Sequence, residues 1–169
     1  MAYNIKAWES FALGQVGASA ALLGLVFVGI SINLRDIIGS GRLVHRAAEA
    51  VVLLGGVLAA ATLVLIPGQR KSVLSTELIV AAVALFAVVL FIQRDAANQP
   101  VDPPAAGPPP LGLAVRRVLG LGTPVVIAIA GLTLALEAGG GLYWWPLAVL
   151  AAYLGALFNA WVLLIEILR

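Results

Sequence analysis

Residues 11–34 read FALGQVGASAALLGLVFVGISINL, a stretch that contains no Asp, Glu, Lys or Arg. A helix that crosses a bilayer needs about 20 consecutive, mostly apolar residues. This stretch therefore predicts a transmembrane helix. It is too long for the apolar part of a cleavable signal peptide, Glu9 precedes it, and no small-residue cleavage site follows it.

Four further segments have the same length and character, so five membrane spans are expected. The later spans are predicted at about 47–66, 73–92, 118–136 and 144–168. The fold class that follows is all-α, a polytopic transmembrane helix bundle. An alternative with four spans and a re-entrant fourth segment stays open, because Pro124 and several glycines lie in that segment.

A proline-rich stretch divides the chain. Residues 95–110 read DAANQPVDPPAAGPPP, and proline removes backbone donors and favours extended conformations. We expect a three-helix transmembrane part over 1–94, a Pro-rich cytoplasmic linker over 95–112 and a two-helix transmembrane part over 113–169. Together these parts form one membrane domain.

The composition of the whole chain agrees with a membrane protein and argues against a soluble enzyme. Of 169 residues, 62% are hydrophobic and 11% are charged, whereas soluble domains have roughly 45–50% and about 25%. The chain contains no cysteine and a single histidine, His45. Thiolate metal sites and bis-His haem are therefore excluded within one chain, and we expect no metal and no cofactor. His45 is interpreted as a headgroup-level residue, with a role as a single axial ligand left open.

Basic residues predict the orientation, because Lys and Arg in short loops favour the cytoplasmic side. With five spans, one side carries Lys6, Arg70 and Lys71. The other side carries seven arginines, namely Arg35, Arg42, Arg46, Arg94, Arg116, Arg117 and Arg169. The chain is thus expected to run N-out and C-in. The arginines are spread over several loops, which favours contact with membrane lipids over nucleic-acid binding.

Small residues mark candidate packing faces, because membrane helices associate where backbones can approach closely. The expected packing positions are Gly17 and Gly24 in the first span, Gly56 and Ala60 in the second, and Ala152 and Ala156 in the fifth. The first span also carries Gln15, Ser19 and Asn33 on the face opposite its small residues. We therefore expect the first helix to be central in the bundle.

Polar residues within the spans are candidates for function, because they are costly inside a membrane. The candidate intramembrane polar network comprises Gln15, Asn33, Glu49, Glu77, Asn159 and Glu166. One interpretation joins Glu49, Asn159, Glu166 and Asn33 into an inward-facing polar pathway. The other is an interfacial salt-bridge network, in which Glu49 and Glu166 neutralise nearby arginines such as Arg46 and Arg169 and Asn159 binds a neighbouring backbone.

The sequence contains no GxSxG, HExxH, Walker or CxxC motif, so we expect no enzymatic activity. The first functional hypothesis is a structural or regulatory subunit that self-associates or docks on a larger membrane complex. The alternative is an oligomeric channel or transporter. Its polar pathway would be lined by residues of the first and fifth helices, namely Gln15, Ser19, Asn33, Asn159 and Glu166.

Several stretches resemble a known family. They are Trp8 to Asn33 with GASAALLGLVFVGISINL, HRAAEA from His45, LIPGQ from Leu65, GLYW from Gly141, and NAWVLLIEILR from Asn159 to Arg169. They resemble small integral membrane proteins frequent in actinobacteria, sometimes labelled "modulator of FtsH protease". The resemblance covers most of the chain except the proline-rich linker. It implies a bacterial inner-membrane protein and transfers no catalytic residues.

Overall fold

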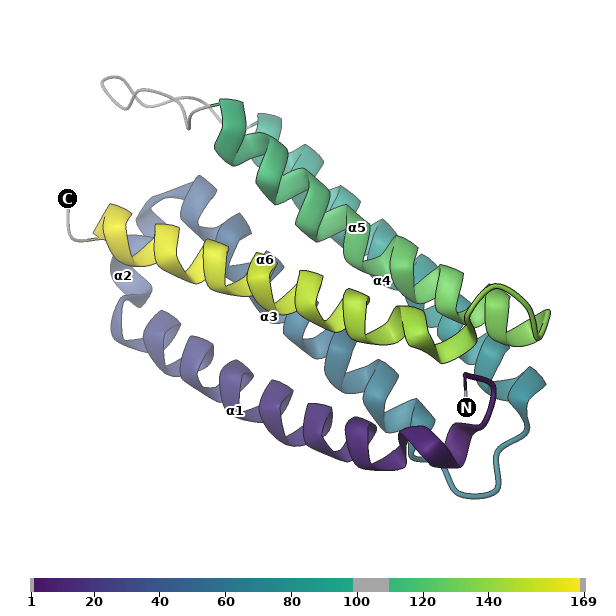
Figure 1. Cartoon of the computed structure of the whole chain (residues 1–169). Helices are drawn as coiled ribbons and strands as arrows, with labels where there is room; N and C mark the ends of the chain where they lie inside the picture. Colours follow the sequence, from purple (N-terminus) through teal and green to yellow (C-terminus); the bar gives the residue numbers. More distant parts are fainter. Residues whose placement is uncertain (1, 99–109, 168–169) are drawn as a thin grey trace.

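The computed structural model describes residues 2–98 and 110–167, and five long helices dominate it (Figure 1). They are α1 (Glu9–Ile32), α3 (Gly41–Val64), α4 (Lys71–Asn98), α5 (Pro110–Ala135) and α6 (Trp144–Ile167). Shorter elements are η1 (Ile5–Trp8), α2 (Leu34–Gly39) and η2 (Gly141–Tyr143). Five helical segments are long and apolar enough to cross a membrane. The all-α fold class and the five expected spans are therefore confirmed.

The fourth expected span is a single helix. α5 runs without interruption through Pro124, so the four-span alternative with a re-entrant segment is wrong. Proline removes the donor to the Gly120 carbonyl. The neighbouring Thr123 hydroxyl donates to the Leu119 carbonyl at 2.8 Å, one residue before the carbonyl that Pro124 frees.

Two helices are longer than the apolar runs from which they were predicted. α4 has 28 residues and ends at Asn98, and α5 begins at Pro110. The expected linker over 95–112 is thus helical at both margins, and its residues 99–109 lie outside the described residues. One charged residue in the extended part of α4 is paired: the His45 Nε2 of α3 lies 2.6 Å from the Asp95 Oδ2 of α4.

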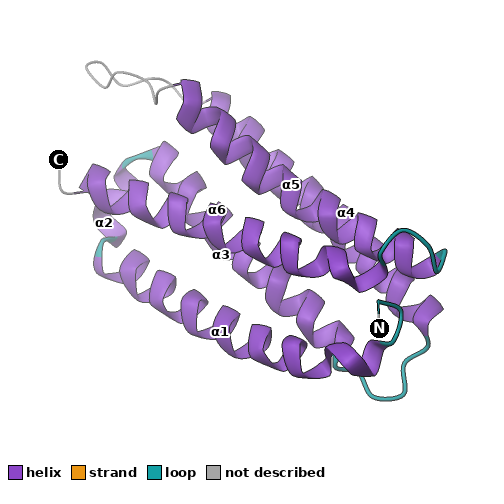
Figure 2. Ribbon diagram, viewed as in Figure 1, coloured by secondary structure: helices purple, strands orange, loops and turns teal. Residues whose placement is uncertain are grey.

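The helices run alternately up and down, so their ends gather at two poles (Figures 1 and 2). We call the pole where α3 and α5 begin, and where α1, α4 and α6 end, the basic end. Its described side chains include six arginines and three carboxylates: Arg35, Arg42, Arg46, Arg94, Arg116, Arg117, Asp36, Glu49 and Asp95. The opposite end has three of each: Lys6, Arg70, Lys71, Glu9, Glu77 and Glu137.

The central helix of the chain is α3, and the expectation of a central first helix is wrong. Half of the span window of α3 is buried, against 11% of that of α1. α3 packs against α1, α4 and α6, whereas α1 packs mainly against α3. Figure 1 shows α1 at one edge of the bundle, away from α4 and α5. The sequence pattern was misleading because it showed two distinct faces on α1, and only one of them contacts the chain.

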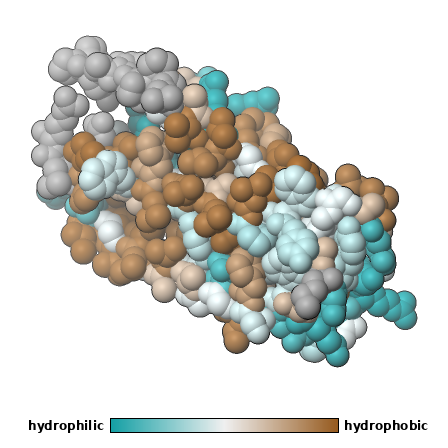
Figure 3. Space-filling view, viewed as in Figure 1, coloured by the Kyte–Doolittle hydropathy of each residue, from teal (hydrophilic) through white to brown (hydrophobic). Residues whose placement is uncertain are grey.

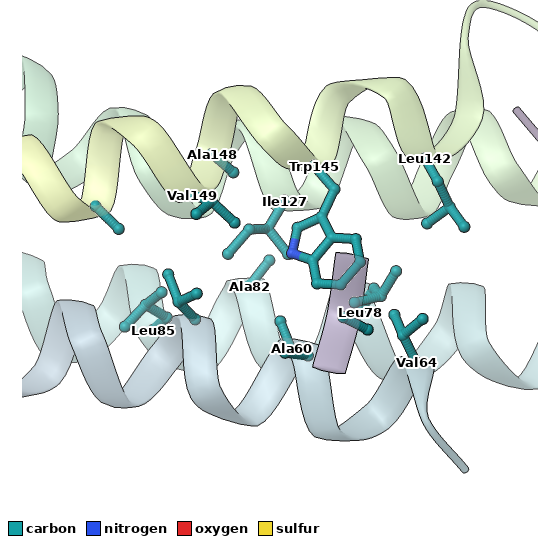
Figure 4. Close-up of a cluster of buried hydrophobic side chains, with 14 of the residues drawn as sticks. Ala60, Val64, Leu78, Ala82, Leu85, Ile127, Leu142, Trp145, Ala148 and Val149 are labelled. Carbon is teal, nitrogen blue, oxygen red and sulfur yellow. The ribbon is translucent and has the colours of Figure 1, made fainter. Parts of the chain in front are cut away.

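The core lies between α3, α4, α5 and α6. Figure 4 shows the Trp145 indole pointing from α6 into a layer of side chains that includes Ala60, Ala82 and Ile127. Ala60, Ala152 and Ala156 are each at most 2% exposed, and a β-carbon on Gly56 would meet the Leu85 side chain. These four expected packing positions therefore lie at helix contacts. On the face drawn in Figure 3, hydrophobic side chains gather over the middle of the bundle.

The N-terminal segment is attached to the α5–α6 connection at the opposite end. The Leu142 amide donates to the Ala2 carbonyl at 3.1 Å, and the Gly140 amide donates to the Tyr3 hydroxyl at 3.2 Å. Gly141 has a φ of 53°, and a β-carbon there would lie 2.7 Å from the Ala2 carbonyl oxygen. Trp8 packs edge-on against Tyr143 with ring centroids 5.3 Å apart. These contacts hold the start of α1 against α6.

Candidate functional site

A buried ion pair joins α3 to α5 near the basic end. The Glu49 Oε2 accepts a hydrogen bond from the Arg116 Nε at 2.5 Å, and the two side chains are 0% and 9% exposed. Glu49 lies eight residues into α3, or about 12 Å from the start of the helix at 1.5 Å per residue. Two opposite charges removed from water are stable only if they pair closely and their remaining polar atoms find partners.

A third helix contributes to this pair. The Gln93 side chain of α4 donates to the Glu49 Oε1 at 2.7 Å and to the Arg116 carbonyl at 3.3 Å. Both carboxylate oxygens of Glu49 therefore have a partner. The Arg116 Nη2 is buried and has no hydrogen-bond partner among the described residues. Glu49, Gln93 and Arg116 thus form one cluster that fastens α3, α4 and α5 together, which we call the charged cluster.

A glycine makes room for the charged cluster. A β-carbon on Gly120 of α5 would lie 2.5 Å from the Gln93 Nε2 and 2.5 Å from the Glu49 Oε1. Real β-carbons do not approach so closely, so only glycine at this position leaves the amide and the carboxylate in place. The close approach of α5 to α4 is therefore part of the geometry of the charged cluster.

A neighbouring contact links α3 to α6. The Arg46 Nη1 lies 3.5 Å from the Asn159 Oδ1, and Arg46 and Asn159 are 8% and 1% exposed. Asn159 therefore pairs with an arginine side chain, and not with a backbone group as one interpretation assumed. Glu166 belongs to α6, and its side chain lies outside the described part of the chain.

The expected pairing of Glu49 with Arg46 on its own helix is wrong. Glu49 pairs with Arg116, which the apolar pattern had placed in a loop before the fourth span. Because α5 begins at Pro110, Arg116 lies on the helix face toward α3. Gln93 was missed for the same reason, since it follows the expected end of the third span. Gln93 follows Val89 by four residues and shares its helix face, but only the structure shows that Val89 is buried.

The first-helix polar residues do not join the charged cluster. The Tyr153 hydroxyl of α6 donates to the Gln15 Oε1 at 2.8 Å and lies 2.9 Å from the Ser19 Oγ. Asn33 donates to the Gly29 carbonyl of its own helix at 2.9 Å. The structure therefore brings Gln15 and Ser19 together through Tyr153, a residue that the sequence analysis did not select.

Glu77, another carboxylate of the expected polar network, lies at the opposite end of the bundle. Glu77 of α4 accepts a hydrogen bond from Gln69, which precedes that helix. Nearby, the Lys71 Nζ lies 2.9 Å from the Glu137 Oε1, and both side chains are exposed. Glu77 therefore belongs to a separate interfacial group.

An apolar layer separates the charged cluster from the Gln15–Ser19–Tyr153 group. Ala50, Leu54 and Ala156 form a buried cluster at this level, with Leu53 and Ala152 next to it. The described part of the chain holds no group of three or more His, Cys, Asp or Glu side chains that could bind a metal ion. Comparison of the chain with protein-family models, with curated proteins and with solved structures found no match.

Proposed function

We propose that this chain is a non-enzymatic membrane subunit that associates with other chains through the outward face of α1. The partner is either a second copy of this chain, which is the simplest case, or a larger membrane complex. The resemblance noted in the sequence supports the bacterial inner membrane as its location.

The observation that carries this proposal is the exposed small-residue face of α1. A β-carbon built on Gly14, Gly17 or Gly24 meets nothing within 4 Å. The buried residues of α1, Ala12 and Ser19, lie on the other side of the helix. Small residues permit close backbone approach between helices in a membrane, where apolar burial alone provides no drive to associate. Gly17 and Gly24, which the sequence marked as packing positions, therefore pack against no described part of the chain and remain available to another helix.

The interior of the bundle supports a subunit over a channel. The polar side chains form separate groups whose hydrogen bonds lie within each group, and apolar residues lie between them. A conducting path needs a continuous series of polar groups or water. The channel alternative would therefore require polar residues from several copies to meet, although those of α1 already face their own chain.

The charge difference between the two ends supports one orientation in the membrane. The basic end has an excess of three positive charges among its described side chains, while the opposite end has none. We propose that the basic end faces the cytoplasm, so that the chain runs N-out and C-in. Reporter fusions are expected to place the N-terminus outside and the C-terminus inside. Two termini on the same side would contradict this topology.

Disulfide cross-linking tests association through α1. The chain has no cysteine, so an Ala21→Cys variant carries a single thiol on the exposed face of α1. Oxidation in native-like membranes is expected to yield a covalent dimer, because close helix contact brings the two thiols together. The matched control is Val83→Cys, which lies in the middle of α4 and is 62% exposed.

Dimer formation at Ala21→Cys well above that at Val83→Cys supports self-association, and a mixed product with another membrane protein supports docking. Equal yields at the two positions would contradict the proposal. A measurement of ion or proton flux in reconstituted vesicles distinguishes the channel alternative from the subunit proposal. Flux that changes in an Asn159→Leu variant whose stability is unaltered would favour a channel.

A further inference from the structure

Two of the three described carboxylates at the basic end are paired within the chain, and the exposed Arg35, Arg94 and Arg117 have no ion pair with a described residue. Glu49 pairs with Arg116, and Asp95 pairs with His45. Arg94 of α4 and Arg117 of α5 are both exposed. Neither has a hydrogen bond or ion pair with any residue that the structure describes. Their positive charges are therefore available to a ligand.

These two arginines lie at the same height on neighbouring helices. The Gln93 side chain reaches the Arg116 carbonyl across the α4–α5 contact, and Arg94 and Arg117 are the next residues on each helix. Arg117 also lies three residues before Gly120, whose missing side chain faces Gln93 and Val89 of α4. Arg117 is therefore on the side of α5 toward α4.

Toward the middle of the bundle, the surface next to these arginines is apolar. Phe91 lies three residues before Arg94, on the same side of α4, and is 71% exposed. Arg94 lies four residues before the end of α4, or about 6 Å at 1.5 Å per residue. Guanidinium groups between an apolar belt and a helix end lie where lipid phosphates are found.

We propose that Arg94 and Arg117 bind the phosphodiester of an anionic phospholipid on the outer surface of the α4–α5 pair. Arginine suits this ligand because its planar guanidinium matches phosphate oxygens in a two-pronged hydrogen bond. Phe91 provides apolar surface for the acyl chains. Two unneutralised positive charges favour a lipid with net negative charge over a zwitterionic one, whose own ammonium group balances the phosphate. This inference does not depend on the proposed association through α1.

The experiment compares lipid binding to the delipidated full chain by native mass spectrometry, with phosphatidylglycerol and phosphatidylcholine as ligands. The wild type is expected to bind phosphatidylglycerol more tightly. In an Arg94→Gln/Arg117→Gln variant this affinity is expected to fall about 30-fold, at roughly 1 kcal/mol for each basic residue near the membrane surface. The control variant, Lys6→Gln/Arg70→Gln, removes two exposed positive charges at the opposite end and is expected to retain the affinity.

Equal affinity of the wild type for the two lipids would overturn the proposal. An equal loss in the control variant would also overturn it, because the effect would then be one of total charge. Adding inorganic phosphate as a competitor distinguishes a site for a lipid phosphate from a site for free phosphate. Displacement of phosphatidylglycerol by equimolar phosphate would overturn the lipid assignment and indicate a free-phosphate site.

Discussion

Replacing Glu49 by leucine is expected to lower the free energy of unfolding by about 3–5 kcal/mol, the usual cost of leaving one partner of a buried ion pair alone. The Arg116 guanidinium would remain buried with its Nε unpaired, and the Gln93 amide would lose its closest acceptor. Unfolding by a denaturing detergent titrated into mild-detergent micelles would measure the change.

A second variant separates the loss of a partner from the loss of the pair. Glu49→Leu/Arg116→Met removes both charges and leaves apolar side chains of similar size, a change that is often neutral or stabilising for buried pairs. We therefore expect the double variant to recover most of the stability lost in Glu49→Leu. A double variant as unstable as Glu49→Leu would show that the ion pair itself is needed for packing.

The exposed Lys71–Glu137 pair is the matched control. Its side chains are 44% and 59% exposed, and exposed pairs contribute about 0.2–1 kcal/mol. Glu137→Gln is therefore expected to change stability by less than about 1 kcal/mol. A loss as large as that of Glu49→Leu would mean that burial does not explain the effect.

Two glycines of α5 are expected to respond differently to alanine, because only one of them faces a close neighbour. A β-carbon on Gly131 would lie 3.0 Å from the Ser75 backbone carbonyl oxygen, 3.3 Å from the Leu78 Cβ and 2.9 Å from the Ile79 Cγ1. A carbonyl and a β-carbon cannot rotate away, so α4 and α5 must separate. Gly131→Ala is expected to cost about 1–3 kcal/mol of unfolding free energy, as overpacking usually does.

Gly122 provides the comparison within the same helix. A β-carbon there meets nothing within 4 Å, so only the backbone preference of alanine for a helix remains, worth up to about 1 kcal/mol. Gly122→Ala is therefore expected to leave stability unchanged or raise it. The same unfolding titration would measure both variants. A Gly131→Ala variant as stable as Gly122→Ala would contradict the close approach of α4 and α5 at this point.

The charged cluster and the α1 face have different consequences for the proposed subunit. The cluster fastens α3, α4 and α5 to one another through three side chains. By contrast, α1 is held by its packing on α3 and by the Tyr153 hydroxyl bonds. Among the five long helices, α1 has the fewest contacts with the described chain, and its outer face is the one proposed to bind a partner, which would complete its burial.

The sequence alone determined the membrane class and the five spans. Length and apolar composition are local properties of a segment, and a segment such as 11–34 has few alternatives to crossing a bilayer as a helix. The packing roles of Ala152 and Ala156 were also readable, because a repeat of small residues every four positions marks one helix face. Helix ends were read less well, because α4 and α5 continue as helices through charged residues that lie beyond the apolar runs.

Only the tertiary structure decided which faces meet. Helical periodicity shows that Gln15 and Ser19 share a face, but it does not show that Tyr153 of α6 lies opposite them. Helical periodicity likewise does not show that Arg116, and not Arg46, is the partner of Glu49. The physical reason is that an ion pair or a hydrogen bond forms with whatever group lies within about 3 Å. That neighbour depends on the rotation, height and order of helices far apart in the chain, and the same arrangement placed α3 at the centre and α1 at the edge.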